Sequence, residues 1–237
     1  MCELTSDPTI QAPSGPAEDA TGEWWVSLSE IDALGQKAAR GAGFSWGLAE
    51  EAGRAARWLA ACGQPGPEAL LETLRRVDGE TASHAPLLEG ALWKAESGWL
   101  CPIAAGAALS DRAQEIASGR AYRLARVMTP LLLVPLLWRA ARDLDCRFKL
   151  EGPGLAVIAL PDGVATRDWD RLRAPEASDL TVARGEEAPV PTTVAGPGPW
   201  RTSVDTWRAL DRFAHRTYAP ATEASRAGAG AGLRDID

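Results

Sequence analysis

The sequence predicts an α+β fold, in which a helical N-terminal part packs on a small, mostly C-terminal β-sheet and a closing helix lies near the C-terminus. Two observations support it. Apolar residues recur at helical spacing before Cys146, whereas short apolar runs between Pro- and Gly-rich connections follow it. Helices followed by strands without strict alternation are typical of α+β proteins. We expect residues 1–23 to form a disordered tail and residues 24–237 to form one globular domain.

The first helix has the clearest local signal. Ser27 and Glu30 have the spacing of a capping box, in which each side chain satisfies a backbone N–H group of the other residue. Apolar residues then recur on one helical face. Gly41 and Gly43 are expected to end the helix, because glycine readily adopts the left-handed conformation found there.

Two more helices complete an antiparallel helical arrangement. The second begins after the capping residue Ser45 and ends at Gly63, and a shorter third helix opens at Pro67. The region Pro86–Leu144 is also predicted to be helical. Within it, the small apolar segment Cys101–Ala108 is expected to form a buried helix that approaches its neighbour closely.

A central buried helix is predicted from Thr129–Pro130 onward, since Leu131–Trp138 is apolar on nearly all sides, and a bend is expected near Pro135. The following sequence favours strands. The expected strands are Phe148–Leu150, Leu155–Leu160 with both faces buried, Leu180–Val182 and Pro191–Val194. A last helix is predicted to begin at Ser203.

Composition excludes several classes of function. Acidic residues outnumber basic ones 32 to 25, giving a formal net charge of −7, and no basic cluster suited to nucleic acid is present. Binding to anionic membrane surfaces is disfavoured for the same reason. The apolar run Val127–Trp138 is too short to span a bilayer. Since Met1–Glu23 lacks the features of a secretory signal, we expect a soluble cytoplasmic protein.

No motif for a metal, a nucleotide or a nucleophile is present. The four cysteines form no C-x-x-C pair, so we expect reduced thiols and no metal site, and we name no cofactor. The segment Gly41–Gly47 has Trp46 where a dinucleotide fingerprint needs its third glycine. The two histidines, His84 and His215, lie in no recognisable catalytic motif. Whether the protein is an enzyme is not decided by its sequence.

The C-terminal segment is the candidate ligand site. Alternating glycines expose backbone N–H groups that can surround an anion, while the terminal acids would repel an anion or gather a hard cation. A flexible acidic tail is the alternative. The candidate binding residues are Glu223, Ser225, Arg226, Gly228, Gly230, Gly232 and Asp235.

Ten tryptophans are many for a chain of this length. Trp24 and Trp25 are adjacent, so their rings would face opposite sides of an extended segment. Trp169 lies among charged residues, where a core position is not expected. Trp and Arg together favour interfaces and ligand platforms. Homo-oligomerisation is the simplest functional interpretation of this surplus, and individual tryptophans that cover local structure are the alternative.

Three stretches resemble a bacterial protein family known only as a domain of unknown function. They are Val26–Leu59, Leu100–Asp111 and Arg216–Asp237, and together they bracket nearly the whole chain after the tail. The resemblance implies an ordered C-terminal segment and supplies no activity or catalytic residue.

A weaker likeness covers the first third, which is similar to the start of the malate/lactate dehydrogenase-like oxidoreductases. Members of that family carry a histidine before the glycine of the second turn, where this chain has Gln64 and Pro65. This departure argues against hydride transfer by that family's mechanism.

From the composition and the C-terminal segment we expect a small-molecule-binding or metabolic protein whose site includes the C-terminal segment. The alternative is a non-catalytic subunit that acts through homo- or hetero-oligomerisation.

Overall fold

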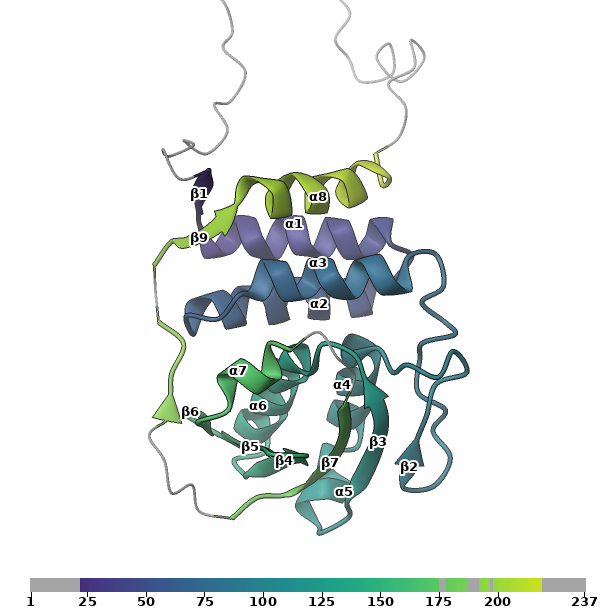
Figure 1. Ribbon diagram of the computed structural model, residues 1–237. Coiled ribbons are helices and arrows are strands. Elements are labelled where there is room, and N and C mark those ends of the chain that lie inside the picture. Colours follow the sequence, from purple (N-terminus) through teal and green to yellow (C-terminus); the bar gives the residue numbers. More distant parts are fainter. Residues whose placement is uncertain (1–21, 175–177, 187–191, 197, 219–237) are drawn as a thin grey trace, which may run out of the picture.

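The computed structural model describes residues 22–174, 178–186, 192–196 and 198–218 (Figure 1). It confirms the α+β class. The helices are α1 Leu28–Gly41, α2 Trp46–Ala61, α3 Gly66–Val77, α4 Pro102–Asp111, α5 Ala113–Ala117, the 3₁₀ turn η1 Pro130–Leu132, α6 Leu133–Asp143, α7 Trp169–Leu172 and α8 Val204–His215. The strands are β1 Glu23–Val26, β2 Leu92–Trp93, β3 Tyr122–Val127, β4 Phe148–Gly152, β5 Leu155–Leu160, β6 Gly163–Thr166, β7 Ser178–Arg184, β8 Thr192–Thr193 and β9 Trp200–Ser203.

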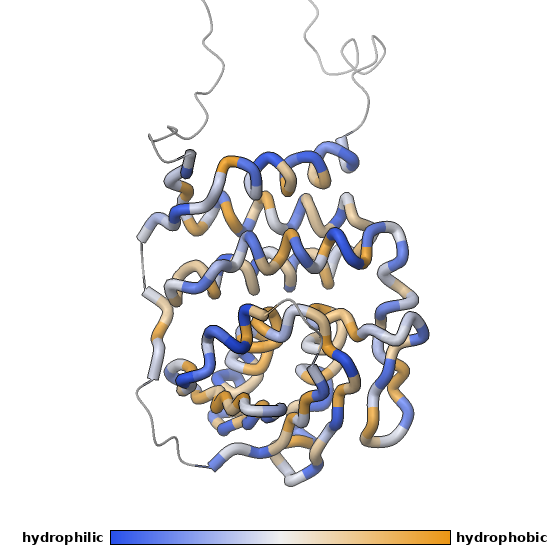
Figure 2. The backbone as a smooth tube through the Cα atoms, viewed as in Figure 1, coloured by the Kyte–Doolittle hydropathy of each residue, from blue (hydrophilic) through white to orange (hydrophobic). Residues whose placement is uncertain are grey.

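Helices α1, α2, α3 and α8 form one helical layer (Figure 1). Figure 2 shows hydrophilic and hydrophobic turns alternating along these helices, as expected for helices that bury one face. The predicted capping box is present, because Glu30 N–H donates to Ser27 Oγ and Ser27 N–H donates to the Glu30 carboxylate. Ser45 and Ser203 cap α2 and α8, as predicted.

The two glycines after the first helix have different roles. Gly43 has a φ of +104°, the left-handed conformation predicted for it. Gly41 is instead the last helical residue of α1, so the predicted conformational reason is wrong there. A Cβ atom at Gly41 would lie 1.8 Å from the backbone oxygen of Phe213 on α8. Gly41 is therefore required by close helix packing rather than by a turn.

The main sheet has the strand order β2-β3-β7-β4-β5-β6-β8. Its neighbours are antiparallel except for the parallel pair β2–β3. Helix α6 packs on this sheet and is the predicted central buried helix. Pro135 lies in its first turn, where a missing N–H group costs no hydrogen bond, so the residue does not require a bend. Helix α4 is the predicted close-packed helix, since a Cβ at Gly106 would lie 3.0 Å from Leu136.

Two expectations for the middle of the chain are wrong. The region Pro86–Leu144 is not wholly helical, because it contains β2 and β3. Burial in β3 alternates between inward Tyr122 and Leu124 and outward Arg123, a pattern with the period of a strand. Strand β5 is not buried on both faces, since Ala156 is exposed and Ile158 is half-buried.

The pair β1–β9 joins the two ends of the described chain. Trp25 is opposite Arg201 in this antiparallel pair, and Val26 is opposite Trp200. The strand places Trp24 half-buried and Trp25 exposed, on opposite sides as expected for adjacent strand residues. Within the described residues, none of the helices is both long and apolar enough to cross a bilayer.

Glu68 is a carboxyl group held beneath this strand pair. Thr202 Oγ1 in β9 donates a hydrogen bond of 2.8 Å to one carboxylate oxygen of Glu68, in the first turn of α3. The other oxygen is buried without a partner among the described residues. Burial raises the pKa of Glu68 above its usual 4.5. The folded state therefore favours the protonated acid, and ionisation of this group destabilises the fold.

We expect Glu68→Gln to stabilise the protein at pH 7.5 and to have little effect at pH 4. The folded pKa of Glu68 is raised, so wild-type stability falls through this group as pH rises from its unfolded pKa through its folded pKa. The neutral amide removes that loss. Melting temperatures of both proteins across this pH range test the prediction. Glu72→Gln is the control, because Glu72 is a partly exposed residue of the same helix that pairs with Arg76. Equal curves for Glu68→Gln and wild type would contradict it.

Candidate functional site

The C-terminal candidate residues lie outside the described residues. All seven, from Glu223 to Asp235, fall in the range 219–237. The site described below was not predicted from the sequence.

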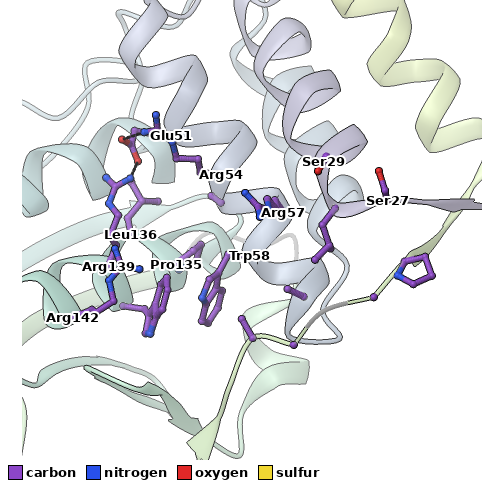
Figure 3. A pocket seen from close by; sticks show the side chains of 18 residues that line it. Ser27, Ser29, Glu51, Arg54, Arg57, Trp58, Pro135, Leu136, Arg139 and Arg142 are labelled. Carbon is purple, nitrogen blue, oxygen red and sulfur yellow. Dashed lines mark hydrogen bonds and ion pairs between the residues drawn. The ribbon is translucent and has the colours of Figure 1, made fainter.

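A pocket of about 810 Å³ lies between α2 and α6 (Figure 3). The beginning of α1 closes one side, and the segment that leads from β8 into β9 closes another. Its volume is within the range of small-molecule sites, and its lining combines apolar surface with a few charged groups, as such sites do. The lining residues are Ser27, Leu28, Ser29, Glu51, Arg54, Ala55, Arg57, Trp58, Ala61, Pro135, Leu136, Trp138, Arg139, Arg142, Ala195, Gly196, Gly198 and Pro199.

Helical spacing explains why the two long helices each present a row of side chains to this pocket. Residues three and four apart lie on one helical face. Glu51, Arg54, Ala55 and Trp58 follow this spacing on α2. The same spacing relates the residues that α6 contributes, which are Pro135, Trp138, Arg139 and Arg142.

The floor of the pocket is formed by two tryptophans. Trp58 and Trp138 pack with ring centroids 5.1 Å apart and ring planes inclined by 32°. Trp58 is buried and Trp138 half-buried. The indole N–H groups of both are buried and have no acceptor among the described residues. Contact between the rings fixes their relative positions, so the two indoles form a pre-arranged apolar part of the pocket lining.

The rim carries four arginines and one carboxylate. Glu51 on α2 contacts Arg139 on α6 at 2.5 Å and Arg54 on its own helix at 3.1 Å (Figure 3). Arg54 also contacts Glu50 at 2.8 Å, and Arg57 lies 3.5 Å from Asp32. Glu51 therefore links α2 to α6 at the edge of the pocket and contacts one arginine of each helix.

Arg142 is held against the aromatic floor. Its guanidinium lies 4.8 Å from the centroid of the Trp138 ring, and it contacts the carboxylate of Asp143 at 3.1 Å. A cation over an indole face is attracted by the ring's negative face. The segment between β8 and β9 is attached to α2 at this pocket. The Gly196 N–H group donates a hydrogen bond of 2.9 Å to the backbone oxygen of Ala61 at the end of α2.

A Ser–His pair elsewhere in the chain does not have the geometry of a catalytic dyad. Ser97 Oγ lies 2.9 Å from His84 Nδ1, but the backbone oxygen of Trp99 lies 3.0 Å from the same nitrogen. A carbonyl oxygen only accepts hydrogen bonds, so Nδ1 carries the proton and cannot remove one from Ser97. His84 is buried and stabilises its loop.

The described thiols and the second histidine are structural. Cys62, Cys101 and Cys146 are free. Burial raises the pKa of the Cys101 thiol to about 11 and that of the Cys62 thiol to about 12, which makes them poor nucleophiles. His215 is the last residue of α8, where it pairs with Asp211 and is largely exposed. In the part of the chain that the structure describes, no three His, Cys, Asp or Glu side chains are grouped to hold a metal ion.

Gln64 has a defined structural role at the turn between α2 and α3. Its buried side-chain oxygen accepts two hydrogen bonds from the Arg173 guanidinium, at 2.9 and 3.2 Å. This contact ties the helical layer to the residue after α7.

Comparison with known families matches one part of the chain. Residues 26–91 match the model of a family described as "Protein of unknown function (DUF3726)". The chain contains a domain of unknown function. The DUF3726 match includes the stretch Val26–Leu59 on which the resemblance was based, whereas Leu100–Asp111 and Arg216–Asp237 lie outside it. No finding supports the likeness to malate/lactate dehydrogenases. No curated protein matches the chain.

The DUF3726 region supplies one wall of the pocket, including all of α2, and α6 lies outside the matched residues. A sequence signal for this pairing exists. The tetrapeptide Arg-Ala-Ala-Arg occurs at residues 54–57 and again at residues 139–142, followed by Trp58 in the first case and preceded by Trp138 in the second. The repeat alone does not predict the pocket, because nothing in the neighbouring sequence shows that the two copies face each other.

Proposed function

We propose that the protein binds a small organic molecule with a flat apolar body in the pocket between α2 and α6. The observation that carries the proposal is the packed pair Trp58–Trp138 at the base of an 810 Å³ pocket. Leu28 and Pro135 extend this apolar surface, and the arginines at the rim supply polar contacts. Such a combination of apolar area and a few polar groups is typical of small-molecule sites.

The arrangement favours binding and orientation. Arginine remains protonated at every physiological pH and therefore acts as a fixed cation rather than as a proton acceptor. Among the described lining residues, the groups with chemistry beyond hydrogen bonding are the Glu51 carboxylate and the hydroxyls of Ser27 and Ser29. Ser27 Oγ already accepts from Glu30 N–H. The proposal is accordingly for a binding site, whether or not a reaction follows.

A neutral fluorescent probe tests this proposal. We expect N-phenyl-1-naphthylamine, a flat uncharged molecule, to become fluorescent on titration with the protein and to saturate at one site per chain. Ala55→Trp, which adds bulk at the pocket lining, should abolish the signal. Ala117→Trp, on α5 outside the pocket, is the control and should leave it unchanged. Unsaturable fluorescence, or equal binding to both variants, would refute the proposal.

The C-terminal segment remains part of our proposal for ligand binding. Its support is the sequence alone, namely Ser225, Arg226, the alternating glycines and Asp235. Deleting residues 228–237 should weaken probe binding while leaving the melting temperature nearly unchanged. A large loss of stability would make the segment structural, and unchanged binding would separate it from the pocket.

Association through surface tryptophans is the second candidate function. The exposed fractions of Trp25, Trp46 and Trp99 are 51%, 66% and 37%, which is unusual for so large an apolar side chain. Exposed aromatic rings beside arginines are typical of interfaces. Arg40 lies 4.5 Å from the Trp46 ring centroid, and Arg126 lies 3.9 Å from that of Trp99.

Native mass spectrometry at several protein concentrations tests this second candidate. A concentration-dependent oligomer that dissociates in Trp25→Ala or Trp46→Ala would support it, with the buried-face variant Trp207→Phe as control. A monomer at every concentration would refute it.

For the compartment we propose the cytoplasm, supported by three free thiols in the described residues, because free cysteines are usual where the environment is reducing.

A further inference from the structure

We infer that the molecule bound between α2 and α6 is a carboxylate, whose flat apolar body contacts Trp58 and Trp138 and whose acid group binds the rim arginines. This inference rests on the proposed binding function and adds the chemical class of the ligand. It follows from the number of arginines in the pocket lining, the accessibility of their guanidinium groups and the position of one internal carboxylate.

The described pocket lining carries more cationic than anionic groups. Four of these residues are arginines and one, Glu51, is acidic, in a chain whose formal net charge is −7. The carboxylates of Glu50, Asp32 and Asp143 pair with these arginines from outside the lining, so the cluster as a whole is balanced in charge. Recognition of an anion therefore depends on the guanidinium groups that line the pocket, because the planar fork of a guanidinium matches the two oxygens of a carboxylate.

The rim arginines retain donors for a ligand. The side chains of Arg54, Arg57 and Arg142 are about half exposed. Asp32 and Asp143, which pair with Arg57 and Arg142, do not line the pocket, whereas Arg54 pairs both with Glu50 outside the lining and with Glu51 in it. Exposed ion pairs contribute little free energy, so they do not fix these guanidinium groups in one arrangement. Each guanidinium has five N–H donors, and these contacts occupy only some of them.

Glu51 shows which group the site accepts. Its carboxylate is shared between Arg54 on α2 and Arg139 on α6, and the Glu51 and Arg139 side chains are only 17% and 27% exposed. Two guanidinium groups from different helices thus already converge on one carboxylate at the edge of the pocket. A ligand carboxylate would bind the free donors of Arg139 and of the neighbouring Arg142, with Glu51 as an internal competitor.

A series with one apolar body tests the inference. Calorimetric titration of the full-length protein would compare 1-naphthoate, neutral 1-naphthylmethanol, 1-naphthyl phosphate and cationic 1-naphthylmethylammonium. We expect 1-naphthoate to bind about tenfold more tightly than the alcohol, because charge-assisted hydrogen bonds exceed neutral ones. The cation should bind most weakly. The preference for 1-naphthoate should decrease with added salt.

Variants of the rim residues test whether the arginines cause the preference for 1-naphthoate over the alcohol. Arg139→Gln and Arg142→Gln should each remove most of the advantage of 1-naphthoate without weakening the alcohol, whereas Glu51→Gln should increase it. If Arg139→Gln unfolds the protein, Arg142→Gln still provides the test, because the Arg142 side chain is half exposed and its replacement is expected to leave the fold intact. Arg76→Gln is the matched control, because Arg76 forms a similar helical ion pair with Glu72 on α3 and does not line the pocket.

The outcomes separate this inference from the function on which it rests. If the alcohol binds as tightly as 1-naphthoate, or if the Arg142 variant keeps the full preference, the carboxylate inference is wrong and the pocket remains an apolar site. Tighter binding of the phosphate than of 1-naphthoate would also overturn it. If no naphthyl compound binds, both the inference and the proposed function fail.

Discussion

Gly41→Ala is expected to lower the free energy of unfolding by about 3 kcal/mol or more, at or above the upper end of the range for overpacked cores. The added Cβ would lie 1.8 Å from the backbone oxygen of Phe213 and 2.6 Å from its carbonyl carbon. Backbone atoms cannot move aside as a flexible side chain can, so α1 and α8 would have to separate. Chemical denaturation measures the loss in free energy of unfolding. We also expect the melting temperature to decrease by about 10 °C.

Gly47→Ala is the matched control for this prediction. Gly47 is also a helical glycine, in α2, but an added Cβ would meet nothing within 4 Å. Replacing a helical glycine at such a position reduces the entropy of the unfolded chain and stabilises by roughly 0.4–1 kcal/mol. Equal stability changes in the two variants would show that α1 and α8 are not as closely packed as described.

Trp58→Ala is expected to cost about 3–5 kcal/mol and to abolish binding of the naphthyl probes. Trp58 is buried, and its ring packs against Trp138 to form the floor of the pocket. Removing it leaves a cavity and lets Trp138 change its orientation. Trp58→Phe should retain part of the stability and of the binding, since the indole N–H group has no partner among the described residues. Denaturation and calorimetry on the same samples measure both effects.

Trp25→Ala shows what loss of an exposed tryptophan does. The Trp25 ring is half exposed, and the Arg201 guanidinium lies 5.2 Å from its centroid. Its replacement should cost less than about 1 kcal/mol, as for other surface substitutions, and should not affect probe binding. Probe binding that survives Trp58→Ala, or that is lost in Trp25→Ala, would place the ligand elsewhere.

Local signals predicted the parts of the fold that depend on neighbouring residues. The caps at Ser27, Ser45 and Ser203 were predictable because each satisfies N–H groups within the next turn. Strand β1 was not, since Glu23–Val26 becomes a strand only by pairing with Trp200–Ser203 at the other end of the described chain. Likewise, the reason for Gly41 lies on α8.

The pocket was unpredictable for the same physical reason. Each Arg-Ala-Ala-Arg segment reads as an ordinary exposed helical face when taken alone. Only the packing of α2 near α6 brings Arg139 to Glu51 and Trp138 to Trp58. The tryptophans beside arginines predict self-association when the sequence is considered alone, whereas the structure places Trp58 and Trp138 in the pocket lining. The candidate ligand residues from Glu223 to Asp235 lie outside the described part of the structure.

The close packing of α1 on α8 bears on how the chain folds while the ribosome makes it. Domains begin to fold as their N-terminal residues emerge. The helices α1, α2 and α3 are made early, but their apolar core also includes Leu210 and Phe213 of α8. Strand β1 likewise has no partner until β9 is made. The apolar face that α8 covers therefore remains exposed to solvent until most of the chain has been translated. In a fragment of residues 26–91 alone, that face would stay exposed to solvent.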